Sequence, residues 1–357
     1  MTVIGGGWEM ATPAEAGFAP DLDECFDICR QTGALPNLHG VIAVRSGRIF
    51  LERYFAGPDA MRGTPLGVVR FGSQTLHDLR SITKSIVGLL YGIALTAGRV
   101  PMPDASLHEQ FPEYPELAGD PARQRLTVRH ALTMTLGMEW DESSFPYSDP
   151  RNSEIAADRA EDRHRYILEQ PIVESPGLRW SYNGGATALL ARLITKGTGR
   201  SLPEFAHEAL FEPLGITHTE WKRSADGDVI AASGLRMTPR DLARIGVAIL
   251  SDGRWGERQV IPAGWLSASF TCEVPIPDGG HYGYQWYLGS VPMSDGAGAL
   301  RREEVISASG NGGQRLFLLP RLDLVVVITA GNYDAPDAGR PPTVVLRDVL
   351  LPALQAK

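Results

Sequence analysis

Cysteine and lysine are scarce in this chain of 357 residues, and no long apolar run interrupts it. Cys25, Cys29 and Cys272 are too few and too scattered for a disulfide framework or a four-ligand zinc site. The longest apolar stretches, 86–95 and 324–328, fall short of the about 20 residues that a membrane-spanning helix needs. The first residues lack the basic patch and apolar block of a secretory signal. We therefore expect a cytoplasmic protein that does not interact with membranes.

Basic runs are also absent. The net charge is −8, and no segment rich in lysine or arginine stands out, so the chain has no electrostatic footprint for a phosphate backbone. Nucleic acid is therefore not an expected partner. The motifs G-x-S-x-G and H-E-x-x-H, a phosphate-binding loop and a dinucleotide-binding glycine pattern are all missing. We accordingly expect neither a cofactor nor a metal.

The few lysines draw attention to Lys84. The chain has four lysines and 30 arginines, and a buried lysine can lose its proton whereas arginine cannot. Lys84 stands three residues after Ser81 at the expected start of a helix, so the alcohol and the amine lie on one face. Burial and the helix N-terminus would lower the pKa of Lys84 and let the neutral amine accept the Ser81 proton. By itself the spacing fits an exposed helix start with a solvated lysine equally well.

Strand patterns occupy both ends of the chain, and helix patterns occupy the middle. Apolar or alternating runs predict strands at 40–44, 48–55, 282–288, 314–319 and 324–329. Helical spacing and cap residues predict helices at 81–97, 128–135, 186–196, 240–251 and 344–351. The first two strands and the last two are each expected to pair as an antiparallel hairpin.

This order predicts an α/β fold of the α+β type. An antiparallel sheet built from both termini, with flanking helices, would hold an inserted and mainly helical domain. We expect the sheet domain to comprise 1–78 and 222–357 and the helical domain to comprise 79–221. Ligand sites favour such junctions, so the active site is expected at the interface of the two domains.

Several ordered segments carry a family resemblance. They are LRSITKSI at 79–86, LTVRHALTMTLGM at 126–138, ESPGLRWSYN at 174–183, FEPLGI at 211–216 and SGLRMTPRDLAR at 233–244. Together they resemble the serine β-lactamase-related superfamily, which includes class C β-lactamases, penicillin-binding D-alanyl carboxypeptidases, carboxylesterases and aminohexanoate-dimer hydrolases. The resemblance covers about 36–329. It implies a β-lactamase/transpeptidase-like fold and an acyl-enzyme mechanism.

The resemblance also implies roles for individual residues. Ser81 matches the acylated nucleophile and Lys84 its proton acceptor, while Tyr182 matches the tyrosine that passes the proton to the leaving group. By position, the backbone N–H groups of Ser81 and Asn311 would form the oxyanion hole. The substrate-binding positions of the same motifs are Asn183, Gly184, Ser309 and Gly310.

Two departures from the family pattern bear on the substrate. Gly184 stands where the Tyr-x-Asn element has its asparagine, which removes an amide that grips the side chain of a β-lactam. Ala308 replaces the lysine or histidine that pairs with the carboxylate of penicillins or peptide C-termini. Both changes favour a carboxylic ester or a small amide over a β-lactam.

Alternatives remain at this stage. A β-lactamase or D-alanyl carboxypeptidase uses the same nucleophile, and a non-catalytic binding protein could retain the same fold. The sequence does not indicate the oligomeric state. Other features have simpler interpretations: a structural role for His130, a solvated acidic loop for Glu139, Asp141, Glu142 and Asp149, and sheet core as much as pocket lining for Tyr282, Tyr284, Trp286 and Tyr287.

Overall fold

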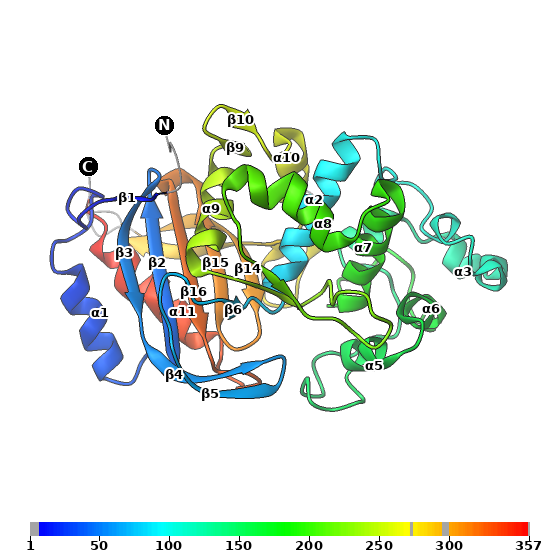
Figure 1. Ribbon diagram of the computed structural model, residues 1–357, viewed down its shortest axis with the longest axis horizontal. Helices are drawn as coiled ribbons and strands as arrows, with labels where there is room; N and C mark the ends of the chain where they lie inside the picture. The colour runs from blue at the N-terminus through cyan, green and yellow to red at the C-terminus, as the bar shows by residue number, and fades with distance from the viewer. Residues whose placement is uncertain (1–6, 272–273, 295–299, 356–357) are drawn as a thin grey trace. The chain divides into compact units, whose positions relative to one another are not determined.

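The computed structural model describes residues 7–271, 274–294 and 300–355 (Figure 1), so Cys272 lies outside the described residues. The chain divides into two compact units. The first comprises 1–82, 236–259 and 288–357, and the second comprises 83–235 and 260–287. The expected domain boundaries and the expected position of the active site between domains stay predictions.

The first unit is built on a sheet to which both ends of the chain contribute strands. Within this unit the strand order is β1 (Glu9–Met10), β3 (Arg48–Tyr54), β2 (Leu38–Arg45), β16 (Leu324–Ala330), β15 (Gln314–Leu319), β14 (Leu300–Gly310) and β13 (Tyr287–Ser294). Strand β2 pairs with β3, and β15 with β16, in antiparallel register, which confirms both predicted hairpins. The short β1 pairs in parallel with β3. Because β2 also pairs with β16, the two chain ends meet in the centre of the sheet.

Alternate residues of these strands face two different helical layers. On one face, side chains such as Val41 and Val326 join a core with α1 (Leu22–Gln31) and the C-terminal helix. On the other face, α9 (Pro239–Leu250) packs so closely that a Cβ on Gly246 would lie 2.6 Å from Val325. The period-2 alternation of a strand explains how one apolar run serves both layers.

Helix α9 begins and ends within one residue of its predicted bounds, whereas the C-terminal helix begins at Arg340, before its predicted start, and α1 was not predicted. Thr238 caps α9, as its hydroxyl oxygen accepts the Asp241 N–H at 3.1 Å. The C-terminal helix comprises α11 (Arg340–Val344), a π-helical segment at Val345–Leu350 and α12 (Leu351–Ala353). Smaller elements are β4 (Ala56–Met61), β5 (Thr64–Arg70), β6 (His77–Asp78), β8 (Leu235–Met237), β9 (Arg254–Trp255), β10 (Arg258–Gln259) and a 3₁₀ turn at Pro320–Leu322.

The second unit is mainly helical. Its α-helices are α2 (Ile82–Thr96), α3 (Pro121–Gln124), α4 (Val128–Leu132), α5 (Ser153–Arg159), α6 (Arg163–Glu169), α7 (Gly184–Thr198), α8 (Leu202–Ala206) and α10 (Ala263–Thr271). Shorter helical turns occur at His108–Gln110, Pro115–Gly119, His207–Phe211 and Glu212–Leu214, with strands β7 (Glu220–Trp221), β11 (Val274–Pro275) and β12 (His281–Tyr282). Within the residues that the structure describes, none of the helices has the length and apolar character to span a membrane.

The predicted continuous strand at 282–288 is wrong. The segment between β12 and β13 is a turn, in which Gln285 has a φ of 67°. The buried Gln285 side chain donates to the Ala131 carbonyl at 3.0 Å and accepts from the Thr187 hydroxyl at 2.7 Å. These contacts with α4 and α7 hold the turn, and they also explain why an apolar run of strand-like composition is not extended here. Tyr282, Tyr284 and Trp286 are buried.

Candidate active site

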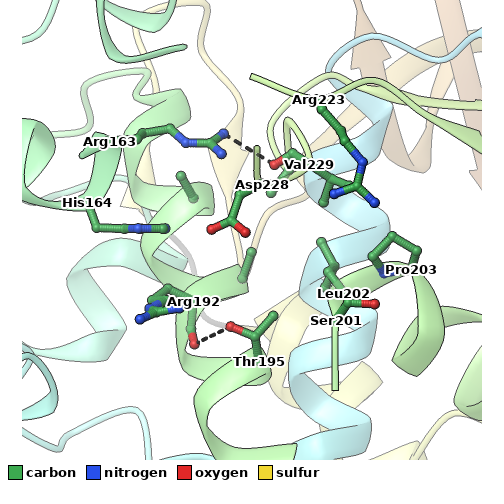
Figure 2. Close-up of a pocket in the computed structure, with 13 residues that line it drawn as sticks. Arg163, His164, Arg192, Thr195, Ser201, Leu202, Pro203, Arg223, Asp228 and Val229 are labelled. Atoms are coloured by element: carbon green, nitrogen blue, oxygen red, sulfur yellow. Dashed lines mark hydrogen bonds between the residues drawn. The ribbon is translucent and has the colours of Figure 1, made fainter. Parts of the chain in front are cut away.

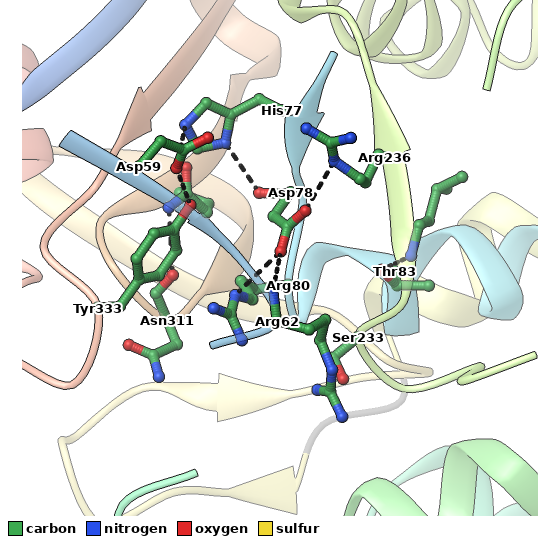
Figure 3. Close-up of polar contacts among 12 residues, drawn as sticks. Asp59, Arg62, His77, Asp78, Arg80, Thr83, Ser233, Arg236, Asn311 and Tyr333 are labelled. Carbon is green, nitrogen blue, oxygen red and sulfur yellow. Dashed lines mark hydrogen bonds and ion pairs between the residues drawn. The ribbon is translucent and has the colours of Figure 1, made fainter. Parts of the chain in front are cut away.

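In the first unit, the chain reaches Ser81 through a constrained backbone. Arg80 has a φ of 50°, in the left-handed region that residues other than glycine seldom adopt. Its guanidinium lies 3.6 Å from the Asp78 carboxylate and 4.4 Å from the centroid of the Tyr333 ring (Figure 3). Asp78 in turn pairs with Arg236 at 2.8 Å. These ion pairs and the ring hold a strained residue directly before a buried serine that is 9% exposed.

Strand β14 closely approaches this segment where it ends at Gly310. A Cβ on Gly310 would lie 2.4 Å from the Leu79 carbonyl oxygen, so only glycine allows this spacing. The next residue, Asn311, donates through its side chain to Asp334 at 2.7 Å and accepts the Asp334 N–H at 2.9 Å. Ser309 pairs with Arg315 in the β14–β15 ladder. The oxyanion-hole role of Asn311 and the substrate-binding roles of Ser309 and Gly310 stay predictions.

In the second unit, Lys84 lies near the start of α2 and is fully buried, with 1% of its surface exposed. Its ammonium donates to the Ala232 carbonyl at 3.1 Å and lies 3.5 Å from a carboxylate oxygen of Glu154. It also lies 4.8 Å from the centroid of the Tyr182 ring and donates to the Tyr182 hydroxyl. Of the predicted catalytic residues, Lys84 and Tyr182 are thus brought together.

The charge of Lys84 differs from the expectation. Burial alone would lower the pKa of Lys84. The Tyr182 oxygen and the Glu154 and Glu142 carboxylates raise it by more than burial lowers it, so the pKa of Lys84 lies above its ordinary value. The expected neutral amine is therefore wrong. The sequence drew attention to Lys84, but it did not indicate that two buried carboxylates accompany it.

Glu142 is one of these carboxylates, and its interpretation as part of a solvated loop is wrong. Only 6% of it is exposed. It accepts hydrogen bonds from the Trp140 indole at 2.5 Å, from the Tyr147 hydroxyl at 3.1 Å and from the Gly184 N–H. Burial and the neighbouring Glu154 raise the pKa of Glu142 to about 7.

Glu154 is the second carboxylate, and the sequence analysis missed it. It lies in the first turn of α5, where the Asn152 side chain accepts its N–H at 3.1 Å. An asparagine cap followed by an acidic residue is typical of an exposed helix start, so residue type gave no signal. Here the carboxylate is buried, and it accepts from the Ser233 hydroxyl besides pairing with Lys84.

Gly184 makes room for both carboxylates. A Cβ at this position would lie 2.7 Å from Glu154 Oε2 and 2.9 Å from Glu142 Oε1. The asparagine that the family motif has here would therefore displace at least one of them. The absence of a side chain at position 184 therefore leaves room for the two buried carboxylates.

The polar groups beside Tyr182 are already engaged within the protein. Asn183 caps α7, because its side-chain oxygen accepts the Ala186 N–H at 3.0 Å. The Gly184 N–H donates to Glu142. The substrate-binding roles of Asn183 and Gly184 stay predictions that must accommodate these bonds.

Aromatic rings line the neighbourhood of Tyr182. The Trp180 ring centroid lies 6.0 Å from that of Tyr182, 5.7 Å from that of Tyr282 and 6.3 Å from that of Tyr287. His130, in contrast, has the structural role expected of it, since its Nδ1 accepts the Thr127 N–H at 3.1 Å at the start of α4.

The second unit also contains a cavity of about 50 Å³, whose lining includes Arg163, Arg192 and Arg223 (Figure 2). Several of its charged groups are engaged within the protein. Arg163 donates to the Val229 carbonyl at 3.2 Å and pairs with Asp226 at 3.1 Å, while Arg223 donates to the Gly227 carbonyl at 2.7 Å. This cavity therefore gives no reason to place substrate recognition there.

The family model described as Beta-lactamase matches residues 29–348, most of the chain. The chain belongs to the Beta-lactamase family. Among curated relatives in this family, the 6-aminohexanoate-dimer hydrolase of Paenarthrobacter ureafaciens is 24% identical in a match over 322 residues that covers 83% of this chain and 73% of that protein. Protein flp of Staphylococcus aureus (strain COL) is 23% identical over 54% of this chain, and the match spans only 36% of that protein.

Solved structures of low sequence identity share the fold. EstCE1, a hydrolase with promiscuous acyltransferase activity, has a TM-score of 0.70 at 14% identity and covers 90% of this chain and 95% of its own. A class C β-lactamase has a TM-score of 0.67 at 18% identity, covering 94% and 96%. The octameric penicillin-binding protein homologue from Pyrococcus abyssi has a TM-score of 0.67 at 17% identity, covering 91% and 76%. The mixed α/β, β-lactamase/transpeptidase-like fold expected from the sequence is confirmed.

Proposed function

We propose that this chain is a serine hydrolase that cleaves a carboxylic ester or a small amide through an acyl-enzyme on Ser81. The observation that carries the proposal is Lys84, three residues after Ser81, fully buried and donating to Tyr182. A buried lysine is costly unless it is paired, and by the sequence resemblance this one matches the catalytic lysine of the family.

The charge of Lys84 assigns the first proton transfer to Tyr182. An ammonium that donates to the Tyr182 oxygen stabilises negative charge on that oxygen. Tyr182, as the phenolate that this ammonium stabilises, takes the proton as Ser81 attacks the substrate carbonyl, and the N–H groups of Ser81 and Asn311 stabilise the oxyanion. Tyr182 next donates the proton to the leaving alcohol or amine. Water attacks the acyl-enzyme, and the same proton path runs in reverse.

Glu142 and Glu154 act through Lys84 in this scheme and do not contact the substrate. The two buried carboxylates raise the pKa of Lys84, and Glu154 is oriented by the Ser233 hydroxyl. They are positioning residues that keep Lys84 charged, and with it the hydrogen bond to Tyr182.

The substrate class follows from what the strand beside the nucleophile lacks. Ala308 is fully buried in β14 and offers no cation for a substrate carboxylate. Gly184 offers no side-chain amide. The relative named as a 6-aminohexanoate-dimer hydrolase and the neighbour described as a hydrolase with promiscuous acyltransferase activity agree with acyl transfer to or from small esters and amides.

The test is hydrolysis of p-nitrophenyl acetate and butyrate by the wild type, by Ser81→Ala and by Ser267→Ala, an exposed helical serine that serves as the matched control. We expect Ser81→Ala to lose activity and the control to keep it, with both folded by circular dichroism. Equal rates in Ser81→Ala and the wild type would overturn the proposal.

Two further measurements separate the alternatives. After phosphonate treatment, mass spectrometry should find one adduct on the peptide that holds Ser81, and a protein that stays unmodified is a binding protein instead. Turnover of nitrocefin faster than that of the esters would assign the chain to the β-lactamases.

A further inference from the structure

Three side chains that the proposed hydrolysis does not use meet inside the first unit. His39 comes from β2, Asp59 from β4 and His77 from β6. Both histidines are fully buried, and Asp59 is 7% exposed. One ligand atom from each of the three lies within 4.8 Å of the other two. Three separate strands thus bring the donor set of a metal site into one buried place.

The outer nitrogen of each ring is held by an oxygen that can only accept. His39 Nε2 lies 3.0 Å from the Asn37 side-chain oxygen, whose amide orientation is fixed because its nitrogen donates to the Pro58 carbonyl at 3.1 Å. His77 Nδ1 lies 3.0 Å from the Asp78 carbonyl oxygen. Both outer nitrogens therefore carry a hydrogen.

The inner nitrogens then face each other as acceptors. In neutral rings His39 Nδ1 and His77 Nε2 present lone pairs to one another across 2.8 Å, and Asp59 Oδ1 lies 3.9 Å from His77 Nε2. Three electron-rich atoms converge in a buried place. Such an arrangement calls for a cation between them.

The surroundings match those of a metal-binding histidine pair. Ligating histidines donate their other N–H to a carbonyl or carboxylate, which fixes the tautomer, and both outer nitrogens here have such a partner. Asp59 is held by the Tyr333 hydroxyl, which donates at 2.8 Å. The ring of Phe71 stacks on that of His39 with centroids 4.1 Å apart and shields the pair. Figure 3 shows Asp59 between His77 and Tyr333.

We propose that His39, Asp59 and His77 bind one divalent transition-metal ion. Two imidazoles and one carboxylate are a ligand set that suits zinc. With Zn–N distances of about 2.0–2.1 Å and a tetrahedral angle, the two inner nitrogens would stand about 3.3 Å apart, so zinc must separate them from their present 2.8 Å. A shared proton would leave that distance unchanged.

The ion would have a structural role. It would join β2 and β4 to β6, and His77 precedes Ser81 by only four residues. Asp59 also accepts a hydrogen bond from the Tyr333 hydroxyl, and the Tyr333 ring contacts the guanidinium of Arg80, the strained residue before Ser81. The site would therefore fix the segment that carries Ser81, and its existence does not depend on the proposed hydrolysis.

Cobalt binding tests the proposal directly. Metal-free protein is titrated with Co²⁺, and we expect one equivalent to give the visible absorption of a low-symmetry site with nitrogen ligands. Asp59→Asn and His77→Gln should lose this absorption. His164→Gln is the matched control, because His164 belongs to a second histidine–aspartate cluster, with Asp226 and Asp228, and it should bind as the wild type does.

Zinc itself gives a second reading that needs no variant. Protein expressed with zinc should hold one ion per chain by elemental analysis, its X-ray absorption should show two imidazole ligands, and a chelator should lower its Tm. If the wild type binds neither cobalt nor zinc, the proposal is wrong and a proton occupies the histidine pair. Loss of binding in His164→Gln but not in His77→Gln would equally overturn it.

Discussion

The molecule buries two groups of ionisable side chains, and they are completed in different ways. In the second unit, Lys84 supplies a cation to Glu142 and Glu154, so the group contains both signs of charge. In the first unit, His39 Nδ1 and His77 Nε2 lie 2.8 Å apart, and Asp59 Oδ1 lies 3.9 Å from His77 Nε2. The Lys84 group is complete within the chain, whereas the histidine group is the one for which we propose an added cation. Burial alone therefore does not show whether a polar cluster is self-sufficient; the count of donors and acceptors does.

Removing the internal cation is expected to have the largest effect. Lys84→Met leaves Glu142 and Glu154 without their partner, and breaking a buried pair costs about 3–5 kcal/mol of the free energy of unfolding. Ester hydrolysis should fall by about 100- to 10,000-fold. Denaturant unfolding and kcat/KM with p-nitrophenyl butyrate measure the two effects.

A double variant provides the control for that change. Lys84→Met with Glu154→Gln should recover part of the lost stability but none of the activity, because it removes one stranded carboxylate without restoring the ammonium. A single Lys84→Met variant as stable as the wild type would contradict the charge-compensated cluster. A chelator, in contrast, should lower the Tm by removing the metal ion proposed for His39, Asp59 and His77.

Gly184→Ala tests the space between the two carboxylates. Its Cβ would lie within 3 Å of both Glu154 and Glu142, and overpacking of this kind costs about 1–3 kcal/mol. Gly264→Ala in α10 is the matched control, since its Cβ meets nothing within 4 Å and alanine favours the helix. Denaturant unfolding of both variants should give changes of opposite sign.

Glu154→Gln should change the pH dependence of hydrolysis. With one carboxylate fewer, the pKa of Lys84 falls, and the alkaline limb of the kcat/KM profile moves to lower pH. We expect a loss of about tenfold at high pH for each unit of pKa. Exposed Glu161→Gln is the control, and an unmoved alkaline limb in Glu154→Gln would remove Glu154 from its positioning role.

The last prediction concerns the pH dependence of stability. The pKa of Glu142 is raised to about 7 in the folded protein, so between the unfolded pKa of about 4.5 and pH 7 the folded state binds a proton that the unfolded state lacks. Stability from this group is complete below that window and is lost as pH rises through it, with a slope of at most about 1.4 kcal/mol per pH unit. Glu142→Gln should lack this slope when Tm is measured from pH 4.5 to 7.

The sequence predicted the backbone better than the charges. Strands β15 and β16 and the Thr238 cap of α9 follow from local patterns, namely alternation, apolar runs and the choice of cap residue. The turn around Gln285 could not be predicted, because its hydrogen bonds go to α4 and α7, far away in the sequence. Distant partners also set the charge of Lys84. Local patterns predict local structure, whereas a buried carboxylate such as Glu154 looks like a solvated one until the fold is known.

The glycine at position 184 restricts how this chain could change its substrate. The family motif that the sequence resembles has an asparagine there, and a side chain at this position needs the space that Glu142 and Glu154 occupy in this protein. Adding the amide therefore requires at least one of these two carboxylates to move, and they are the anions that hold the lysine. The room for a substrate-binding amide and the charge of Lys84 are thus linked through a single missing Cβ.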